Sequence, residues 1–313
     1  MERLLVTGGS GMLGSNTAYL ARERFDTQLT FNSHPVEIRN CASVQMDLRD
    51  RASVLRTVEG FRPHGIIHTA AFLPAKVCEE DPAMARAIHV DGVGYLCEAA
   101  KAVGAKLIHI STDWVFDGKK GLYTEDDPPS ALNEYGRSKL RGEKVLQGSG
   151  VSHCIIRTSL YGWNLRAGKF CYAEMALDRL GKGEEFSAPD DQYLSPILVN
   201  VLAEALFEIY ARNITGILHV TGSEVCSRYD FCRTAAEVFG LKRDLVKPVP
   251  ISPEYFGVRA PRDQSLDVTR AKSLLKTELP GIREGLLAMK RLRESGYVAA
   301  LRGQGESGAT GDS

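Results

Sequence analysis

The sequence has little that suits a nucleic acid, a membrane or a disulfide framework. Its 39 lysines and arginines balance 39 aspartates and glutamates, so no broad basic surface is predicted. No apolar run approaches the roughly 18 residues of a membrane span, and the opening "MERLLVTGG" breaks into glycines too early for a signal peptide. Seven cysteines form an odd set without C-x-x-C spacing, which argues against disulfides and a zinc site. We therefore expect a cytoplasmic protein that recognises small ligands, with no nucleic-acid, membrane or metal partner.

Short apolar strands alternate with helical patterns along the first half of the chain. The predicted strands are "RLLVTGG", "QLTFNS", "SVQMD", "GIIHTAA", "KLIHIS" and "SHCIIRTS". Helices are expected between them, including a long one that opens at Asp81-Pro82 and another near 134–148. This alternation predicts an α/β fold with a Rossmann-type doubly wound parallel sheet.

The pattern loosens beyond residue 160. We expect residues 1–160 to form the Rossmann domain and residues 161–300 to form a smaller mixed α/β C-terminal lobe that binds substrate, with contacts that interleave. Helices are predicted at "KFCYAEMALDRLG", "LVNVLAEALFEIYAR" and "RYDFCRTAAEVFG", with short strands such as "GILHVTG" between them. Residues 301–313, rich in Gly and Ser, are expected to be a disordered tail.

The stretch "TGGSGMLG" after the first strand fits two glycine motifs. Gly9, Gly11 and Gly14 spell G-x-G-x-x-G, whereas Gly8, Gly11 and Gly14 spell G-x-x-G-x-x-G. In either register, glycines permit a tight turn that brings backbone N–H groups and a helix N-terminus close to a pyrophosphate. Its position at the first strand of an alternating sheet favours dinucleotide binding over a merely structural turn.

The second strand lacks the carboxylate that usually holds the adenosine ribose. It ends "TFNSHP", with Asn32, Ser33 and His34 where an acidic residue is expected. This favours a 2′-phosphorylated ribose, with Ser33, His34 or Arg39 as donors. NADP(H) is therefore the preferred cofactor, and NAD(H) is the alternative.

A proton-transfer site is predicted from "STDWVFDG" and "NEYGRSKL". Thr112 follows a strand end, and Tyr135 precedes Lys139 by one helical turn. A tyrosine and a lysine on one helix face, with a hydroxyl arriving from a strand, can exchange protons with a ligand. The lysine ammonium is expected to lower the pKa of the phenol from about 10.

With "ISTDWVFDG", the residues Tyr123 to Pro128, "NEYGRSKLRGE" and "DDQYLSP", the chain resembles the extended short-chain dehydrogenases/reductases, and most of all the dTDP-4-dehydrorhamnose reductases, up to about residue 290. The resemblance implies that Thr112, Tyr135 and Lys139 are catalytic. It also implies a set of cofactor-binding residues: Gly8, Ser10, Gly11, Met12, Leu13, Gly14, Asn32, Ser33, His34, Asp47, Leu48, Ala70, Ala71, Tyr135 and Lys139. Substrate contacts are expected from Asp113, Trp114 and Tyr193.

The activity that the resemblance implies is NAD(P)H-dependent reduction of a nucleotide-linked 4-keto sugar, in a protein that could form a homodimer. Related dehydratases carry Glu after the Thr-Asp pair, and related epimerase-reductases carry Cys after the hydroxyl residue; this chain has Trp114 and Asp113 there. Two alternatives stay open: another nucleotide-sugar epimerase/reductase, and an NADP-binding regulatory subunit similar to the methionine adenosyltransferase β subunit.

Three positions depart from the family pattern. His89 in "AIHVDG" replaces a common Asn, so the hydrogen-bond relay behind the catalytic lysine is expected to differ. Leu194 and Ile197 in "DDQYLSPIL" replace smaller or polar residues. These changes put substrate recognition in doubt and modestly favour the regulatory alternative.

Overall fold

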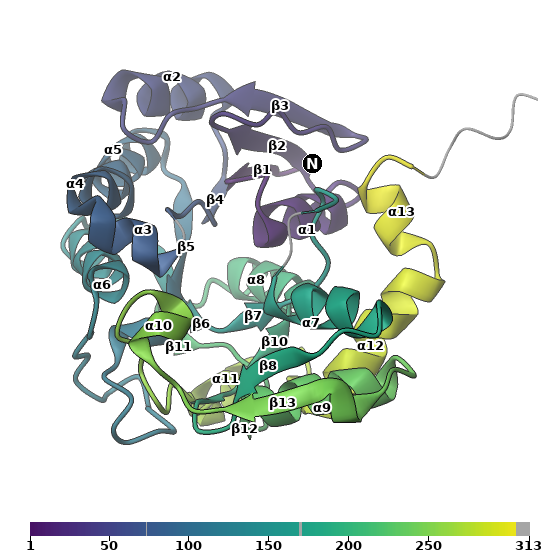
Figure 1. The fold of residues 1–313 in the computed structure, drawn as a ribbon. Coiled ribbons are helices and arrows are strands. Elements are labelled where there is room, and N and C mark those ends of the chain that lie inside the picture. Colours follow the sequence, from purple (N-terminus) through teal and green to yellow (C-terminus); the bar gives the residue numbers. More distant parts are fainter. Residues whose placement is uncertain (73, 169–170, 305–313) are drawn as a thin grey trace, which may run out of the picture.

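The computed structural model of the chain describes residues 1–72, 74–168 and 171–304. Its centre is a seven-stranded parallel sheet with the strand order β11-β6-β5-β4-β1-β2-β3 (Figure 1). The strands are β1 (Arg3–Thr7), β2 (Asp26–Phe31), β3 (Cys41–Gln45), β4 (Gly65–His68), β5 (Lys106–Thr112), β6 (His153–Thr158) and β11 (Gly216–His219). The chain runs outward from β1 in one direction and then returns to add β4 on the other side, so the strand order reverses beside β1. The predicted doubly wound Rossmann-type sheet is confirmed.

Helices cover both faces of this sheet. They are α1 (Met12–Ala21), α2 (Arg51–Phe61), α3 (Ala75–Glu80), α4 (Pro82–Arg86), α5 (Gly92–Val103), α6 (Glu134–Gln147) and α8 (Val199–Ala211). Alternate residues of β1 enter different cores: Leu4 and Val6 pack on the side of α1 and α8, and Leu5 packs on the side of α2 and α5. This follows from the two-residue period of a strand, and it explains why the central strands are apolar without interruption.

The long helix predicted from Asp81 is interrupted. Asp81 does cap a helix, since its carboxylate accepts from the backbone N–H of Met84 at 2.9 Å, but α4 ends at Arg86 and a π-helical segment, η1 (Ala87–Asp91), precedes α5. The wider turn holds His89, which is buried and hydrogen-bonded through both ring nitrogens. The predicted long helix is thus present as one helical run over residues 82–103 that opens at Asp81. The π-turn inside it was not predicted, because periodicity does not reveal a tertiary hydrogen bond that favours a local π-turn.

The second half of the chain builds a smaller lobe. Its strands pair as β7 (Leu160–Tyr161) with β10 (Ile197–Leu198), β8 (Phe186–Pro189) with β13 (Val246–Val249), and β9 (Tyr193–Leu194) with β12 (Cys226–Ser227). Its helical segments are α7 (Tyr172–Gly181), α9 (Arg228–Val238), η3 (Arg243–Leu245), α10 (Pro253–Phe256), α11 (Thr269–Leu274), α12 (Ile282–Glu294) and α13 (Tyr297–Leu301).

The two halves of the chain interleave. The strand expected at "GILHVTG" in the smaller lobe is β11, which lies in the central sheet beside β6, and α8 packs against α1. The predicted disordered tail falls largely on residues 305–313, outside the described residues.

Three further findings concern partners. No helix among the described residues has the length and hydropathy needed to cross a membrane. All seven cysteines are free thiols. Within the described ranges, no three His, Cys, Asp or Glu side chains lie together in a way that would hold a metal ion.

We expect Gly142→Ala to destabilise the protein. A Cβ at Gly142 in α6 would lie 2.1 Å from the backbone oxygen of His89, so α6 and η1 would have to separate, at a cost of roughly 1–3 kcal/mol. Gly94→Ala is the matched control, because a Cβ there meets only Val145 at 3.8 Å and alanine favours a helix by about 1 kcal/mol. Urea unfolding should show that Gly142→Ala lowers the free energy of unfolding and that Gly94→Ala raises it. Equal changes in the two variants would contradict the close packing of α6 on η1.

Candidate active site

The predicted site residues gather at the carboxyl edge of the central sheet. Gly8 follows β1, Ala70 lies just beyond β4, and Thr112 ends β5. Open α/β sheets bind ligands at this edge, beside the point where the strand order reverses. The geometry of the site can therefore be followed from strand to strand.

The glycine loop adopts the G-x-x-G-x-x-G register. Gly8 has a φ of +73°, and a Cβ there would lie 2.7 Å from the backbone nitrogen of Ala70. The N–H of Gly11 donates to the Gly8 oxygen at 2.9 Å, and a Cβ at Gly14 would lie 2.2 Å from that same oxygen. Gly9 instead packs on β2, where its N–H donates to Thr30. Gly8, Gly11 and Gly14 thus make the turn, and Gly9 is a packing position.

This turn leaves the start of α1 open to an anion. Gly11 is the N-cap and supplies no side-chain acceptor, so the first N–H groups of α1, at Met12 and Leu13, lack a cap. The positive end of the helix dipole lies at the same place. A pyrophosphate fits this cradle, whereas side chains at the three glycines would fill it.

The residues beyond β2 present hydroxyl and imidazole groups. Ser33 and His34 are exposed, and the Ser33 hydroxyl lies 3.0 Å from His34 Nδ1. Asn32 is also exposed, and its carbonyl accepts from Gln45. In β2 itself, Asp26 is the only acidic residue, and it lies at the opposite end of the strand.

Asp47, expected beside the adenine, is paired with a residue that the sequence analysis missed. Arg49 Nη2 lies 2.6 Å from Asp47 Oδ2, and the backbone N–H of Arg49 donates to the same carboxylate. These bonds hold the pKa of Asp47 below its usual value. Leu48 is buried, while Ala71 is exposed. The spacing of "MDLRD" could have suggested the pair.

The three predicted catalytic residues come together where α6 meets β5. The Thr112 hydroxyl donates to Asp113 Oδ1 at 3.0 Å, and it interacts with the Tyr135 phenol in a way that favours the ionised phenol. Asn133 caps α6 by accepting from the N–H of Gly136. Lys139 Nζ donates to the Ile110 carbonyl of β5 at 2.7 Å. The helix and strand are therefore tied together at the site.

Burial sets the ionisation of these groups. The pKa of Tyr135 is raised, because burial outweighs the hydrogen bond with Thr112. The predicted net lowering of the Tyr135 pKa was wrong, because the desolvation of the phenol dominates. Burial also lowers the pKa of Lys139 to about 8, against the attraction of Glu143, which raises it.

His89 joins three segments behind the catalytic helix. Its Nε2 accepts from the backbone N–H of Phe72 at 2.8 Å, so the ring proton must be on Nδ1, which lies 2.8 Å from the Ser138 hydroxyl. Ser138 in turn donates to the Tyr135 carbonyl. Burial lowers the pKa of His89 to about 2, so the ring is neutral. The altered relay positions α6 through uncharged hydrogen bonds.

His68 and His109 lie side by side on β4 and β5, both buried, and they differ in their hydrogen bonds. The Thr7 hydroxyl lies 2.6 Å from His68 Nδ1. His109 Nε2 lies 3.5 Å from Lys139 Nζ, whereas its Nδ1 is buried without a partner among the described residues. Burying this nitrogen without a hydrogen bond lowers the stability of the fold, and the sequence did not reveal it.

The expected substrate residues divide into two groups. Asp113 and Trp114 adjoin the catalytic residues, and the Trp114 ring meets those of Tyr135 and Phe256 edge to face, at 6.0 and 5.8 Å. Phe256, from α10, was missed because a single aromatic in an irregular segment carries no spacing signal.

Tyr193 is 42% exposed on β9, and among the described residues its side chain has no hydrogen bond or ring contact with the catalytic groups. Leu194 and Ile197, singled out as departures from the family, are buried core residues.

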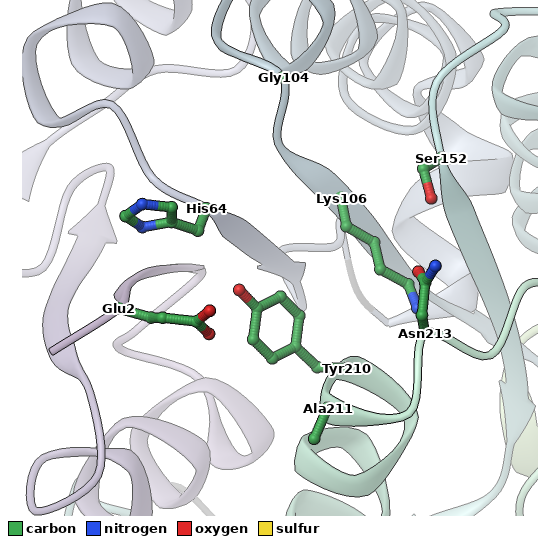
Figure 2. Close-up of a pocket in the computed structure, with 8 residues that line it drawn as sticks. All are labelled: Glu2, His64, Gly104, Lys106, Ser152, Tyr210, Ala211 and Asn213. Atoms are coloured by element: carbon green, nitrogen blue, oxygen red, sulfur yellow. The ribbon is translucent and has the colours of Figure 1, made fainter.

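A cavity of about 320 Å³ lies at the other edge of the sheet (Figure 2). Glu2 and His64 precede β1 and β4, Lys106 begins β5, and Tyr210 comes from α8. The Lys106 amine donates to the Ile209 carbonyl near the end of α8. This cavity is separated from the catalytic residues by the length of the strands, and we do not assign the reaction to it.

Asp113 should make the stability of the protein depend on pH. Burial raises the pKa of its carboxyl to about 7. Folding therefore favours the protonated form, and the stability present at low pH is lost as pH rises toward 7. We expect Asp113→Asn to gain stability relative to the wild type between pH 5 and pH 8, by roughly 2–3 kcal/mol at about 1.4 kcal/mol per pH unit. Urea unfolding at both pH values measures it.

The control for this experiment is Asp117→Asn. The Tyr123 hydroxyl donates to Asp117 and holds its pKa below the usual value, so Asp117 does not titrate between pH 5 and pH 8. Its substitution should shift stability by the same amount at both pH values. A constant difference for Asp113→Asn as well would contradict the raised pKa.

Comparison with known proteins agrees with this geometry. The chain is 34% identical over 270 residues to the dTDP-4-dehydrorhamnose reductase of Mycobacterium tuberculosis, covering 83% of each chain. It is 31% identical over 312 residues to the methionine adenosyltransferase 2 subunit beta of Bos taurus, covering 94% of this chain and 91% of the relative.

Among solved structures, dTDP-4-dehydrorhamnose reductase from Bacillus anthracis in complex with NADP superimposes with a TM-score of 0.79 at 29% identity, covering 93% of this chain and 99% of that one. The model of the RmlD substrate binding domain matches residues 1–293. These findings confirm the predicted resemblance to the extended short-chain dehydrogenases/reductases. The chain belongs to the RmlD substrate binding domain family.

Proposed function

We propose that the protein is an NADPH-dependent reductase of a nucleotide-linked 4-keto sugar. One observation carries the proposal: Thr112, Tyr135 and Lys139 meet at the carboxyl edge of the sheet, next to an open glycine cradle. The reductase relatives from Mycobacterium tuberculosis and Bacillus anthracis support the substrate class and the cofactor.

The cradle residues fit a dinucleotide. Gly8, Gly11 and Gly14, with Ser10, Met12 and Leu13 between them, would hold the pyrophosphate through backbone N–H groups. Asn32, Ser33 and His34 would face the adenosine ribose, Asp47 and Leu48 the adenine, and Ala70 and Ala71 the cofactor cleft. When bound, the nicotinamide cofactor supplies the hydride.

Side chains of the protein carry out the proton transfer. Tyr135 donates its phenolic proton to the substrate oxygen as negative charge develops there, and Thr112 hydrogen-bonds the same oxygen. The raised pKa keeps Tyr135 protonated before reduction, so it enters the reaction as an acid. Lys139, positively charged below a pH of about 8, stabilises the phenolate that forms and would bind the nicotinamide ribose.

A cofactor-binding regulatory subunit is the second candidate. It is favoured by the similarity to methionine adenosyltransferase 2 subunit beta, which covers 94% of this chain against 83% for the Mycobacterium tuberculosis reductase. Activity of a purified methionine adenosyltransferase catalytic subunit, measured with and without this protein, separates it from NADPH oxidation with a dTDP-4-keto sugar. We also propose a cytoplasmic location. We further propose a homodimer, and light scattering on the purified chain would test this oligomeric state.

Tyr135→Phe should lower kcat by at least 100-fold and leave NADPH affinity nearly unchanged, because it removes the proton donor and keeps the ring. Lys139→Met should impair both turnover and NADPH binding, since Lys139 is assigned to the phenol and to the ribose. Steady-state rates and calorimetric titration with NADPH measure the two effects. Full turnover in Tyr135→Phe would remove this residue from the mechanism.

NADPH should bind at least tenfold more tightly than NADH, a difference of about 1.4 kcal/mol. The reason is that hydroxyl and imidazole donors, and no carboxylate, follow β2 at Ser33 and His34. Ser33→Glu would place a negative charge there, and calorimetry should then show the preference moving toward NADH. Tighter binding of NADH by the wild type would reverse the assignment.

A further inference from the structure

Arg228 is a half-buried cation without a carboxylate at ion-pair distance among the described residues. It is the first residue of α9, and across the described ranges it forms no ion pair. By contrast, Arg157, the buried arginine behind the site, is paired with Glu143 at 2.8 Å. Holding a guanidinium away from bulk water without a counter-ion is costly, so an unpaired one suggests a partner that arrives from outside.

The guanidinium is held in place by other contacts. Its Nε donates to the side-chain oxygen of Gln192, and its backbone N–H donates to the Gln192 carbonyl at 3.0 Å. Gln192 is itself fully buried and donates to the Pro261 carbonyl. The faces of the guanidinium lie over the rings of Tyr172 and Phe256, at 4.6 and 5.4 Å from their centroids. These contacts use one of the five N–H donors and leave the four on Nη1 and Nη2.

Ring contacts connect Arg228 to the reaction centre. Phe256, below the guanidinium, packs against Trp114, and Trp114 packs against the catalytic Tyr135. The positive charge of Arg228 acts on Asp113, the neighbour of Thr112, and favours its ionised form. The guanidinium therefore lies on the smaller lobe, close enough to act on Asp113 and connected through Phe256 and Trp114 to Tyr135.

We propose that Arg228 binds an anionic group of the substrate through its two terminal nitrogens. A planar guanidinium can donate two parallel hydrogen bonds to two oxygens of one anion. Two parts of the substrate offer such oxygens: a phosphate of the nucleotide diphosphate and a carboxylate on the sugar. The anion would be the counter-ion that Arg228 lacks among the described residues. Gln192 and the rings of Tyr172 and Phe256 hold the guanidinium in position to bind it. This inference rests on the proposed function and identifies the part of the substrate that the smaller lobe recognises.

The test is calorimetric titration of the NADP⁺-saturated protein in two arms. The first compares thymidine diphosphate with thymidine; the second compares UDP-glucuronate with UDP-glucose. If Arg228 binds a phosphate, Arg228→Gln should weaken binding of thymidine diphosphate and of both UDP-sugars at least tenfold and leave thymidine unchanged. If it binds a carboxylate, only the binding of UDP-glucuronate should weaken at least tenfold. Loss in the first arm identifies a phosphate, and loss of the preference for glucuronate over glucose in the second identifies a carboxylate. Arg228→Lys, which keeps the charge without the fork, should give an intermediate loss.

Arg233→Gln is the matched control, because Arg233 is on the same helix and also stacks on a tyrosine ring, that of Tyr229. It should bind every probe as the wild type does. The inference is overturned if Arg228→Gln and Arg228→Lys bind all four probes within twofold of the wild type, or if the wild type binds neither thymidine diphosphate nor UDP-glucuronate. Because binding is measured without turnover, a protein that binds the anion through Arg228 yet reduces no nucleotide sugar would refute the proposed reductase and keep this anion site.

Discussion

The hydrogen bond from Lys139 to the Ile110 carbonyl is the interaction on which the site depends. It ties α6, the helix that carries Tyr135, to the end of β5, and so fixes Tyr135 relative to Thr112. Two glycines make this approach feasible: a Cβ at Gly136 would lie 2.2 Å from the Trp114 oxygen, and one at Gly142 would lie 2.1 Å from the His89 oxygen. Side chains at these positions would hold α6 away, and the proton donor would then no longer face the carboxyl edge of the sheet.

Burial is the second constraint, because it sets the charge of each group in this small volume. It raises the pKa values of Tyr135 and Asp113 and lowers that of Lys139. The neutral His89 supports α6 without adding charge, and the buried ion pair of Glu143 with Arg157 is neutral as a pair. The site therefore holds an acid that stays protonated and a lysine that can respond to the phenolate, which is suited to protonating a developing alkoxide.

The two halves of the molecule contribute different chemistry to one edge of the sheet. The first half supplies glycines and backbone N–H groups, which bind the part of a dinucleotide that many enzymes share. The smaller lobe supplies aromatic rings and the unpaired guanidinium of Arg228, which are suited to distinguishing one substrate from another. Because β11 pairs with β6 and α8 packs on α1, the smaller lobe is connected to the central sheet at two places. We expect a change in the lobe to alter specificity while the glycine turn stays the same.

The sequence by itself determined the α/β class, the succession of the first six strands along the chain and the glycine loop, and it proposed Thr112, Tyr135 and Lys139 as a site, because each depends on local periodicity or spacing. The residues alone left the glycine register open, and the family resemblance implied Gly8, Gly11 and Gly14. The close approach of Gly8 to Ala70, which follows a strand far away in the chain, agrees with that register. Tertiary structure alone decided the π-turn at His89, the entry of β11 into the main sheet, the direction of the Tyr135 pKa shift and the placement of Phe256 and Arg228. These depend on burial and on long-range hydrogen bonds, which arise only when distant segments pack together and which no pattern of neighbouring residues contains.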